Sequence, residues 1–357
     1  MPVSLSPAHP GSQTYRLDPV VASPDQLTPT WPEKAAQARL HFVSGKGGTG
    51  KSTVAAALAL ALAEGGRRVL LVEVEGRQGI AQLFDVPPLP PQETKVAAAE
   101  GGGEVMALAI DIETAFLEYL EMFYNLGFAG RAMRKFGAIE FATTIAPGLR
   151  DVLLTGKIKE CVVRTDKSGK RVYDAVVVDA PPTGRIGNFL DVTKAMADLA
   201  KGGPVRSQSE GVVRLLHSDE TVVHLVTLLE ALPVQETTDA AEELARADLR
   251  LGTIVVNRTS PQFLPAETLA DAAKGRIDAE VIRAGLQKSG ITLDEHDFAG
   301  LLTETIEHAS VLEAQEESAG ALSEVDGARL HLPSLADGVD LGGLYELAEY
   351  LTEQGVR

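Results

Sequence analysis

The residues with the clearest chemistry lie in one short segment, Gly45-Lys46-Gly47-Gly48-Thr49-Gly50-Lys51-Ser52. It satisfies the pattern G-x-x-x-x-G-K-[ST], in which glycines let the backbone curl so that successive N–H groups point at phosphate oxygens. Lys51 is then expected to neutralise β and γ phosphates, and the Ser52 hydroxyl to coordinate Mg²⁺. With Thr53 expected to support the α phosphate, the segment predicts a site for ATP and Mg²⁺.

The flanking sequence predicts the strand and helix that this loop requires. Residues 39–44 read as an apolar strand, and residues 53–64 are rich in the helix formers Ala and Leu. The helix would present its positive end to the same anion. Further apolar runs predict strands at residues 69–74, 105–110, 174–179, 221–228 and 252–257. Buried strands alternating with helices predict a doubly wound α/β fold with a mostly parallel sheet covered on both faces.

The remainder of the chain divides by composition. Residues 1–36 hold seven of the 19 prolines and are expected to form a disordered arm whose end Trp31 could anchor. Residues 37–357 are predicted to form a single P-loop ATPase domain. Helical insertions are expected in three long stretches, at about residues 111–165, 185–218 and 263–330.

Charge and cysteine content exclude several classes of function. The chain has 33 Lys and Arg against 50 Asp and Glu, and a net charge of −17 argues against a nucleic-acid-binding surface over most of the molecule. A local basic patch remains open. The single Cys161 excludes an intrachain disulfide and a cysteine-cluster metal site within one chain. No apolar run reaches the roughly 20 residues that a membrane span requires, so we expect a cytoplasmic protein without an intrinsic span.

Four segments together resemble one known family. They are the loop with its additional early lysine, Lys46; the strand-end segment Val178-Asp179-Ala180-Pro181-Pro182-Thr183-Gly184-Arg185; the segment from Val69 to Gln78; and Val255-Val256-Asn257-Arg258. They are similar to the deviant P-loop, the D-T-A-P-T-G-H switch II, the V-L-L-V-S-T-D-P-A-S switch I and the V-V-N element of the anion-transporting ATPases. That family includes ArsA and the eukaryotic ATPase that targets tail-anchored membrane proteins. The resemblance covers about residues 39–260 and 330–352.

The resemblance assigns roles to three residues outside the loop. It implies that Asp179 is the carboxylate held near Mg²⁺, that Glu75 replaces the aspartate that orients the attacking water, and that the Asn257 amide binds the adenine edge. The simpler alternatives are a strand-end cap for Asp179, an exposed loop acid for Glu75 and a turn cap for Asn257. The sequence also departs from the family, since Arg185 stands where histidine is typical.

The resemblance implies that Lys46 acts between two subunits. Because Lys46 comes early in the loop, we expect it to lie on the outer wall of the site, where it cannot easily reach its own phosphates. In deviant P-loop ATPases the equivalent lysine reaches the nucleotide of a partner subunit, as an arginine finger does. Because this chain has one such loop, we expect a dimer with an identical or related ATPase subunit. The alternative is a solvated loop lysine.

We therefore predict a dimeric Mg-ATP-hydrolysing switch, slow without a partner, whose helical insertions bind a partner or client. One alternative is a targeting factor or chaperone for hydrophobic segments or membrane proteins. It draws on seven aromatic residues within 116–141, although a buried helical core would explain them equally well. The ATPase subunit of an anion or metalloid efflux system is another alternative. A partitioning or septum-positioning ATPase is disfavoured because the C-terminal helix carries Glu346, Glu349 and Glu353.

Overall fold

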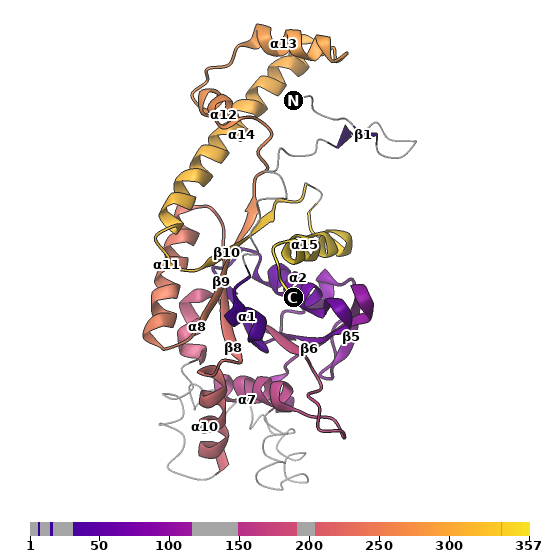
Figure 1. Ribbon diagram of the computed structural model, residues 1–357, viewed down its shortest axis with the longest axis vertical. Coiled ribbons are helices and arrows are strands. Elements are labelled where there is room, and N and C mark those ends of the chain that lie inside the picture. The colour runs from indigo at the N-terminus through magenta and orange to yellow at the C-terminus, as the bar shows by residue number, and fades with distance from the viewer. Residues whose placement is uncertain (1–5, 8–14, 17–30, 116–148, 191–203, 337) are drawn as a thin grey trace. The chain divides into compact units, whose positions relative to one another are not determined.

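The computed structural model describes residues 6–7, 15–16, 31–115, 149–190, 204–336 and 338–357. Its main feature is a sheet of eight strands in the order β10-β9-β8-β3-β7-β4-β6-β5 (Figure 1). Five neighbouring pairs, from β9 through to β6, are parallel, whereas β5 runs antiparallel to β6. The strands are β3 (Leu40–Gly45), β4 (Arg68–Glu73), β5 (Thr94–Ala99), β6 (Gly103–Ala109), β7 (Ala175–Asp179), β8 (Thr221–Thr227), β9 (Leu251–Thr259) and β10 (Ala328–Pro333).

Helices cover both faces of this sheet because alternate strand residues point to opposite sides. On β3, Val43 joins one hydrophobic cluster, whereas Leu40 and Phe42 join the other. The first cluster includes residues of α1 (Glu33–Gln37), α2 (Lys51–Ala63), α3 (Gly79–Leu83) and α15 (Leu341–Glu353). The second includes residues of α7 (Leu149–Val163), α8 (Thr183–Leu190), α10 (Pro204–Leu216) and α11 (Ala231–Arg246). The doubly wound, mostly parallel α/β fold is confirmed.

Helix α2 explains why the segment after the loop is apolar on every side. All residues from Val54 to Ala63 are buried, because α2 packs against the sheet and also against α15. A helix enclosed in this way needs no polar face. The small alanines let the neighbouring strands and helix approach closely. The loop before α2 is therefore mounted on one of the most deeply buried helices described in the structure.

The six predicted strands are present, and the eight-stranded sheet contains two more, β5 and β10. Strand β5 is an edge strand with three alanines, and β10 follows the long polar helical stretch. Two 3-10 turns, η2 (Glu64–Gly66) and η3 (Glu100–Gly102), join the elements around β4 to β6. The helical stretch expected at 263–330 is helical only as far as Leu322 among its described residues, since residues 328–330 begin β10.

The chain forms two compact units, and one of them contains most of the third expected insertion. The smaller unit contains residues 259–323, and the larger unit contains the strands β3 to β8 and the helices that cover them. In the smaller unit α12 (Ala266–Ala273) packs on α14 (Glu295–Leu322) through Leu269, Ala272 and Ala309, and α13 (Ala279–Lys288) lies between them in the chain. Strands β1 (Ser6–Pro7) and β2 (Tyr15–Arg16) pair antiparallel. The single-domain prediction for residues 37–357 remains untested.

The other two expected insertions are only partly described. Helix α7 occupies the end of the 111–165 stretch, and α8 and α10 occupy both ends of the 185–218 stretch. Residues 116–148 and 191–203 lie outside the described residues. The aromatic stretch 116–141 is among them, so the structure does not test whether it is core or client surface.

The end of the expected arm belongs to the fold. Residues 33–37 form α1 instead of disordered chain, which corrects the boundary placed at residue 36. Trp31 is buried and stacks on His224 at 5.2 Å and on His41 at 6.0 Å between ring centroids. Trp31 therefore fixes the described chain at the start of α1 to the sheet.

The two stacked histidines are held in one neutral tautomer. The Thr253 N–H donates to His224 Nδ1 at 3.2 Å, so His224 carries its proton on Nε2. That group donates to His41 Nδ1 at 3.1 Å, and His41 Nε2–H in turn donates to the Ala38 carbonyl at 3.3 Å. Burial lowers the pKa of His41 to about 4 and that of His224 well below its usual range. The two histidines thus form a buried chain of hydrogen bonds that links β9, β8 and β3 to the Ala38 carbonyl.

Candidate nucleotide site

Strand β3 is an interior strand of the sheet, between β8 and β7. The phosphate-binding loop follows the carboxyl end of β3 and leads directly into α2. Gly50 has φ +87°, a left-handed conformation that disfavours a side chain, and it is the N-cap of α2. Gly45 has no room for a Cβ, because that atom would overlap the Val226 carbonyl on β8. Lys51, Ser52 and Thr53 follow in the first turn of the helix, where its positive end and free N–H groups favour an anion.

Ser52 and Asp179, the two predicted Mg²⁺ ligands, meet at this edge of the sheet. The Ser52 hydroxyl donates to Asp179 Oδ2 at 2.6 Å, across 127 residues of sequence. A hydroxyl and a carboxylate are oxygen ligands of the kind that Mg²⁺ uses. The hydroxyl of Thr183, four residues after Asp179 in the sequence, is buried and has no hydrogen-bond partner among the described residues. This donor set fits a Mg²⁺ site that bound phosphates would complete.

Asp179 has an electrostatic environment suited to a cation. Burial raises the pKa of Asp179 to about 6, while the Ser52 hydrogen bond and the charge of Lys51 oppose this rise. Glu73 and Glu75 raise it further, because like charges disfavour ionisation. A divalent cation would reverse this balance by favouring the ionised carboxylate.

Glu75, the candidate for orienting water, is held by two arginines. Its carboxylate pairs with Arg185 of α8, and Arg77 Nη2 lies 3.4 Å from Glu75 Oε2. Arg77 is on the same loop, whereas Arg185 is on the switch II segment 110 residues away. Two of the positions at which this sequence departs from the family motifs, Glu75 and Arg185, are therefore in direct contact.

Glu73 was missed by the sequence analysis. It ends β4, is only 2% exposed, and accepts hydrogen bonds from Gln78 N at 2.6 Å and Ile80 N at 3.2 Å. The Gln78 amide in turn binds the Leu89 backbone at 2.7 and 3.4 Å. These contacts fix the far end of the loop that carries Glu75. The sequence did contain a signal for Glu73, because an acidic residue at the end of an apolar strand indicates a position at the edge of the site.

Asn257 contacts the phosphate loop directly. The side-chain amide of this 5% exposed residue donates to the Thr49 carbonyl at 2.8 Å. A Cβ on Gly50 would overlap the same amide nitrogen, so Asn257 and the glycine fit closely. The structure thus shows a loop-holding contact, and the adenine contact expected from the family motif remains a prediction.

Lys46 does not extend freely into solvent. Its ammonium lies 3.2 Å from Glu236 Oε1 on α11 of the same chain. Both side chains are partly exposed, so the pair is accessible and of modest strength. The structure therefore places Lys46 at the rim of the site with an acid partner, and the trans role remains a prediction.

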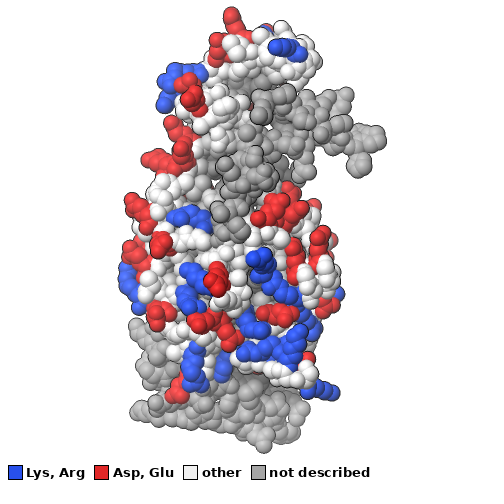
Figure 2. Space-filling model, viewed as in Figure 1, with Lys and Arg blue, Asp and Glu red and all other residues white. Residues whose placement is uncertain are grey.

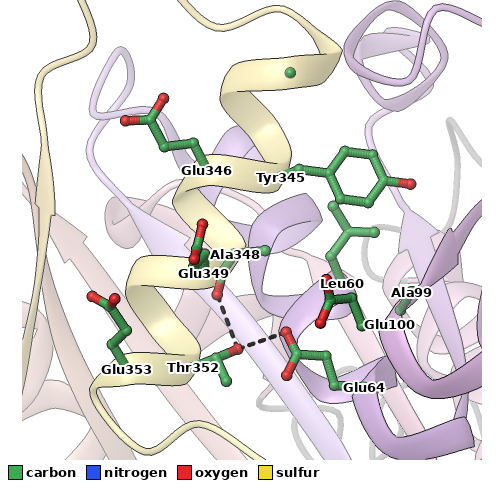
Figure 3. A pocket seen from close by; sticks show the side chains of 11 residues that line it. Leu60, Glu64, Ala99, Glu100, Tyr345, Glu346, Ala348, Glu349, Thr352 and Glu353 are labelled. Carbon is green, nitrogen blue, oxygen red and sulfur yellow. Dashed lines mark hydrogen bonds between the residues drawn. The ribbon is translucent and has the colours of Figure 1, made fainter.

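A separate hollow of about 600 Å³ lies between α2, α15 and the turn η3 (Figure 3). None of the loop residues Gly45–Ser52 lines it. Its lining is acidic, and Thr352 bonds there to Glu64 at 2.9 Å and to the Ala348 carbonyl at 3.1 Å. The negative charges of five lining glutamates would repel phosphates, so this hollow is unsuited to bind a nucleotide. The glutamates are Glu64, Glu100, Glu346, Glu349 and Glu353.

Figure 2 shows acidic and basic side chains interspersed over one face of the molecule. Several arginines at the amino ends of the strands are paired with acids; Glu220, for example, lies within 4.0 Å of Arg39 and 3.6 Å of Arg171. Among the described residues, no helix is long and apolar enough to cross a membrane, and no cluster of three metal-ligating side chains occurs. Cys161 is buried, which raises the pKa of its thiol to about 12.

Fold and site together define an α/β nucleotide-binding protein of the P-loop class. Comparison with known proteins narrows this class: residues 38–203 match the family described as anion-transporting ATPase. The chain is 69% identical over 327 residues to the ATPase BagA of Mycobacterium tuberculosis, covering 92% of this chain and 96% of that protein. The chain therefore belongs to the anion-transporting ATPase family.

More distant relatives carry different names. A putative arsenical pump-driving ATPase 2 of Aquifex aeolicus is 25% identical over 254 residues, or 63% of this chain and 81% of that protein. An ATPase ASNA1 homolog of Entamoeba dispar is 23% identical over 276 residues, or 66% and 79%. Family membership and these names support ATPase activity.

Proposed function

We propose that this protein is a Mg-ATP-dependent molecular switch that works as a dimer. The observation that carries the proposal is the meeting of Ser52 and Asp179 beside Lys51 at the start of α2. Ser52 and Asp179 would hold Mg²⁺, which supplies charge neutralisation of the phosphates. Lys51 would bind the β and γ phosphates, and the N–H groups from Gly45 to Ser52 would bind their oxygens.

Glu75 is the proposed group for orienting the attacking water. It follows β4, whose last residue, Glu73, pairs in register with Asp179 at the end of β7, so it lies on the rim of the Mg²⁺ site. Its carboxylate is only partly exposed and has to exchange at least one arginine for water. This exchange is one reason to expect slow hydrolysis without a partner.

Lys46 is proposed to complete the site of a second subunit. Release from Glu236 would free its ammonium to approach the phosphates of the partner's nucleotide, where a cation stabilises developing charge. The partner is a second copy or a related ATPase. Hydrolysis would then end the contact, so that nucleotide state controls dimer geometry.

Mixing two inactive variants tests this proposal for identical subunits. Lys46→Ala keeps its own Mg²⁺ ligands but cannot donate the trans lysine, whereas Asp179→Asn can donate it but cannot hold Mg²⁺. In a mixed dimer one of the two sites is complete. Because half of randomly formed dimers are mixed, the mixture should regain about a quarter of wild-type turnover.

The controls make the result decisive. Each variant alone should be inactive, and a mixture of Lys46→Ala with a variant carrying both substitutions should stay inactive. Full turnover by Lys46→Ala alone would refute the trans role. Inactive parents whose mixture shows no recovery would refute the homodimer and point to a related subunit.

A client-binding role is a second candidate, favoured by the seven Phe and Tyr residues within 116–141. ATP would then regulate the release of a hydrophobic segment. Hydrogen exchange over residues 116–141 should slow when an apolar helical peptide is added, and the slowing should differ with and without an ATP analogue. Deep protection that neither ligand changes would identify a closed core and exclude this role.

A further inference from the structure

The hollow between α2, α15 and η3 has a lining that favours positive charge. Its volume of about 600 Å³ lies in the range of ligand-binding cavities. Five glutamates are among its described lining residues, and no lysine, arginine or histidine is. Three of the glutamates come from α15, and the other two come from the wall opposite, at the end of α2 and in η3 (Figure 3). The hollow therefore suits a cationic occupant.

Two helix ends add to the negative charge of this lining. Helix α2 ends at Ala63 with Glu64 as its C-cap, and α15 ends at Glu353. Neither helix has a basic residue in its last turn, although the negative end of a helix favours a cation and disfavours an acid. Acids at these two helix ends are unfavourable within the chain itself, and a bound cation would relieve the repulsion.

The spacing of the carboxylates disfavours a single metal ion as the occupant. Across the described residues, no three acidic, histidine or cysteine side chains are close enough together to hold one metal ion. An occupant that matches separated carboxylates carries several separated positive charges, as the lysines and arginines of a polypeptide do. A second copy of this chain has the same net charge of −17 and is less suited to the hollow.

Exposed apolar side chains adjoin the hollow. Leu341 is 39% exposed, and Val339 and Tyr345 are each 40% exposed. Leu341 directly precedes Gly342, which lines the hollow, and Tyr345 lines the hollow itself. The Tyr345 hydroxyl donates to the Ala98 carbonyl at 2.9 Å, which holds the ring in place. Such a ring can pack against an apolar side chain or stack on a guanidinium. A small polyamine would use the acids but not these apolar side chains.

We propose that the hollow and the adjoining apolar residues of α15 form a docking surface for a partner protein. The partner inserts a segment that carries Lys or Arg side chains beside an apolar one, and the acidic net charge of this chain speeds their encounter. The hollow lies at the opposite end of α2 from the phosphate loop, and the 13 residues of α2 separate the two by about 20 Å. A docked segment leaves the nucleotide site open, so the proposal does not depend on the ATPase switch.

The probe for this surface is a synthetic helical peptide with lysines along one face and leucines along the other. Fluorescence anisotropy of the labelled peptide measures its binding to the full chain without nucleotide. A second peptide has the same charge but serines in place of leucines, and spermine represents a small polyamine. Hydrogen exchange of residues 341–353 should slow when the leucine peptide binds, which locates the peptide on α15.

Two pairs of substitutions distinguish this surface from general attraction to an acidic chain. Glu349→Gln with Glu353→Gln removes two exposed charges from α15, and Glu313→Gln with Glu317→Gln removes two exposed charges at the same spacing from α14. The α15 pair should weaken binding of the leucine peptide about tenfold, and the α14 pair less than about twofold. Because Glu353 lies at a negative helix end, the α15 pair should also keep or raise the urea midpoint of unfolding.

A matched pair of apolar substitutions tests the other half of the surface. Leu341→Ser should weaken binding of the leucine peptide about two- to fivefold, whereas Val281→Ser on α13, where the residue is 66% exposed, should leave binding unchanged. The serine peptide should bind more weakly than the leucine peptide.

No binding of the leucine peptide, or equal weakening by the α15 and α14 pairs, would overturn the proposal. Serine and leucine peptides that bind equally tightly would overturn it too, because the apolar residues would then contribute nothing. Spermine that binds as tightly as the leucine peptide and depends on the α15 pair would identify a polyamine site instead. A lower urea midpoint in the α15 pair would show that these acids support the fold, which would also contradict the proposal.

Discussion

The contact between Asn257 and the phosphate loop makes a quantitative prediction about Gly50. Replacing Gly50 by Ala places a side chain at φ +87°, which costs about 1–2 kcal/mol. The new Cβ also overlaps the Asn257 amide nitrogen and forces it away from the Thr49 carbonyl. Leaving that buried carbonyl unpaired costs about 1–3 kcal/mol. Gly50→Ala should therefore lower the free energy of unfolding by about 2–5 kcal/mol in total.

Asn257→Ala alone should cost about 1–3 kcal/mol, because it removes the same hydrogen bond. In that background Gly50→Ala no longer meets the amide, so only the strain of about 1–2 kcal/mol remains. The hydrogen bond is lost once, whichever substitution removes it. The double variant should then be more stable than the sum of the single variants predicts, with a coupling of about 1–3 kcal/mol.

Urea unfolding followed by fluorescence measures this coupling. Trp31 is the only tryptophan, is buried, and stacks on His224 of β8, the strand next to the one that carries Asn257. Its emission should report loss of the sheet directly. Single-variant effects that add to within about 0.5 kcal/mol would refute the argument, because the two sites would then be independent.

Three further predictions concern other parts of the site and its support. Because burial raises the pKa of Asp179 to about 6 in the folded chain, against about 3.9 when unfolded, the folded state binds the extra proton. Stability should then fall as pH rises from about 4 to about 6, by on the order of 3 kcal/mol, and urea unfolding of Asp179→Asn should lack this contribution. Glu236→Gln should raise steady-state turnover of the assembled enzyme up to about fivefold by releasing Lys46, and unchanged turnover would show that this pair does not limit hydrolysis. Trp31→Ala should cost about 3–5 kcal/mol of unfolding free energy and Trp31→Phe clearly less, whereas equal small losses would show that the tryptophan only covers the surface.

The sequence predicted the site residues that are close together in the chain and those whose positions follow from the order of the strands. The loop from Gly45 to Ser52 is contiguous, and Asp179 ends an apolar strand. In a parallel sheet the carboxyl ends of strands meet at one edge, so the strand pattern alone predicts that Ser52 and Asp179 approach each other. The parallel core followed from the same pattern.

Contacts that depend on side-chain direction were not predictable. Arg185 and Glu75 are 110 residues apart, and Asn257 and Thr49 are 208 apart. The departures from the family motifs at Glu75 and Arg185 were visible in the sequence, but nothing in their spacing indicates that they form one ion pair. Strand β5 escaped prediction because its Ala-rich edge sequence lacks the β-branched residues that mark buried strands.

The contacts at the site indicate how the proposed nucleotide switch would operate at little energetic cost. Asp179 is bonded to Ser52, Glu75 to arginines, and Lys46 to Glu236, so these three charged candidates already have protein partners. Mg²⁺ and phosphates offer each group a replacement of similar or greater strength, as Asp179 exchanges a hydroxyl for a cation and Lys46 exchanges a carboxylate for a phosphate. Because each of these three charges would exchange one partner for another, the differential affinity of the nucleotide would be available to move the loops. Lys46 differs from Asp179 and Glu75 because its replacement partner would be a phosphate bound to the proposed second subunit. A single chain therefore cannot supply that partner.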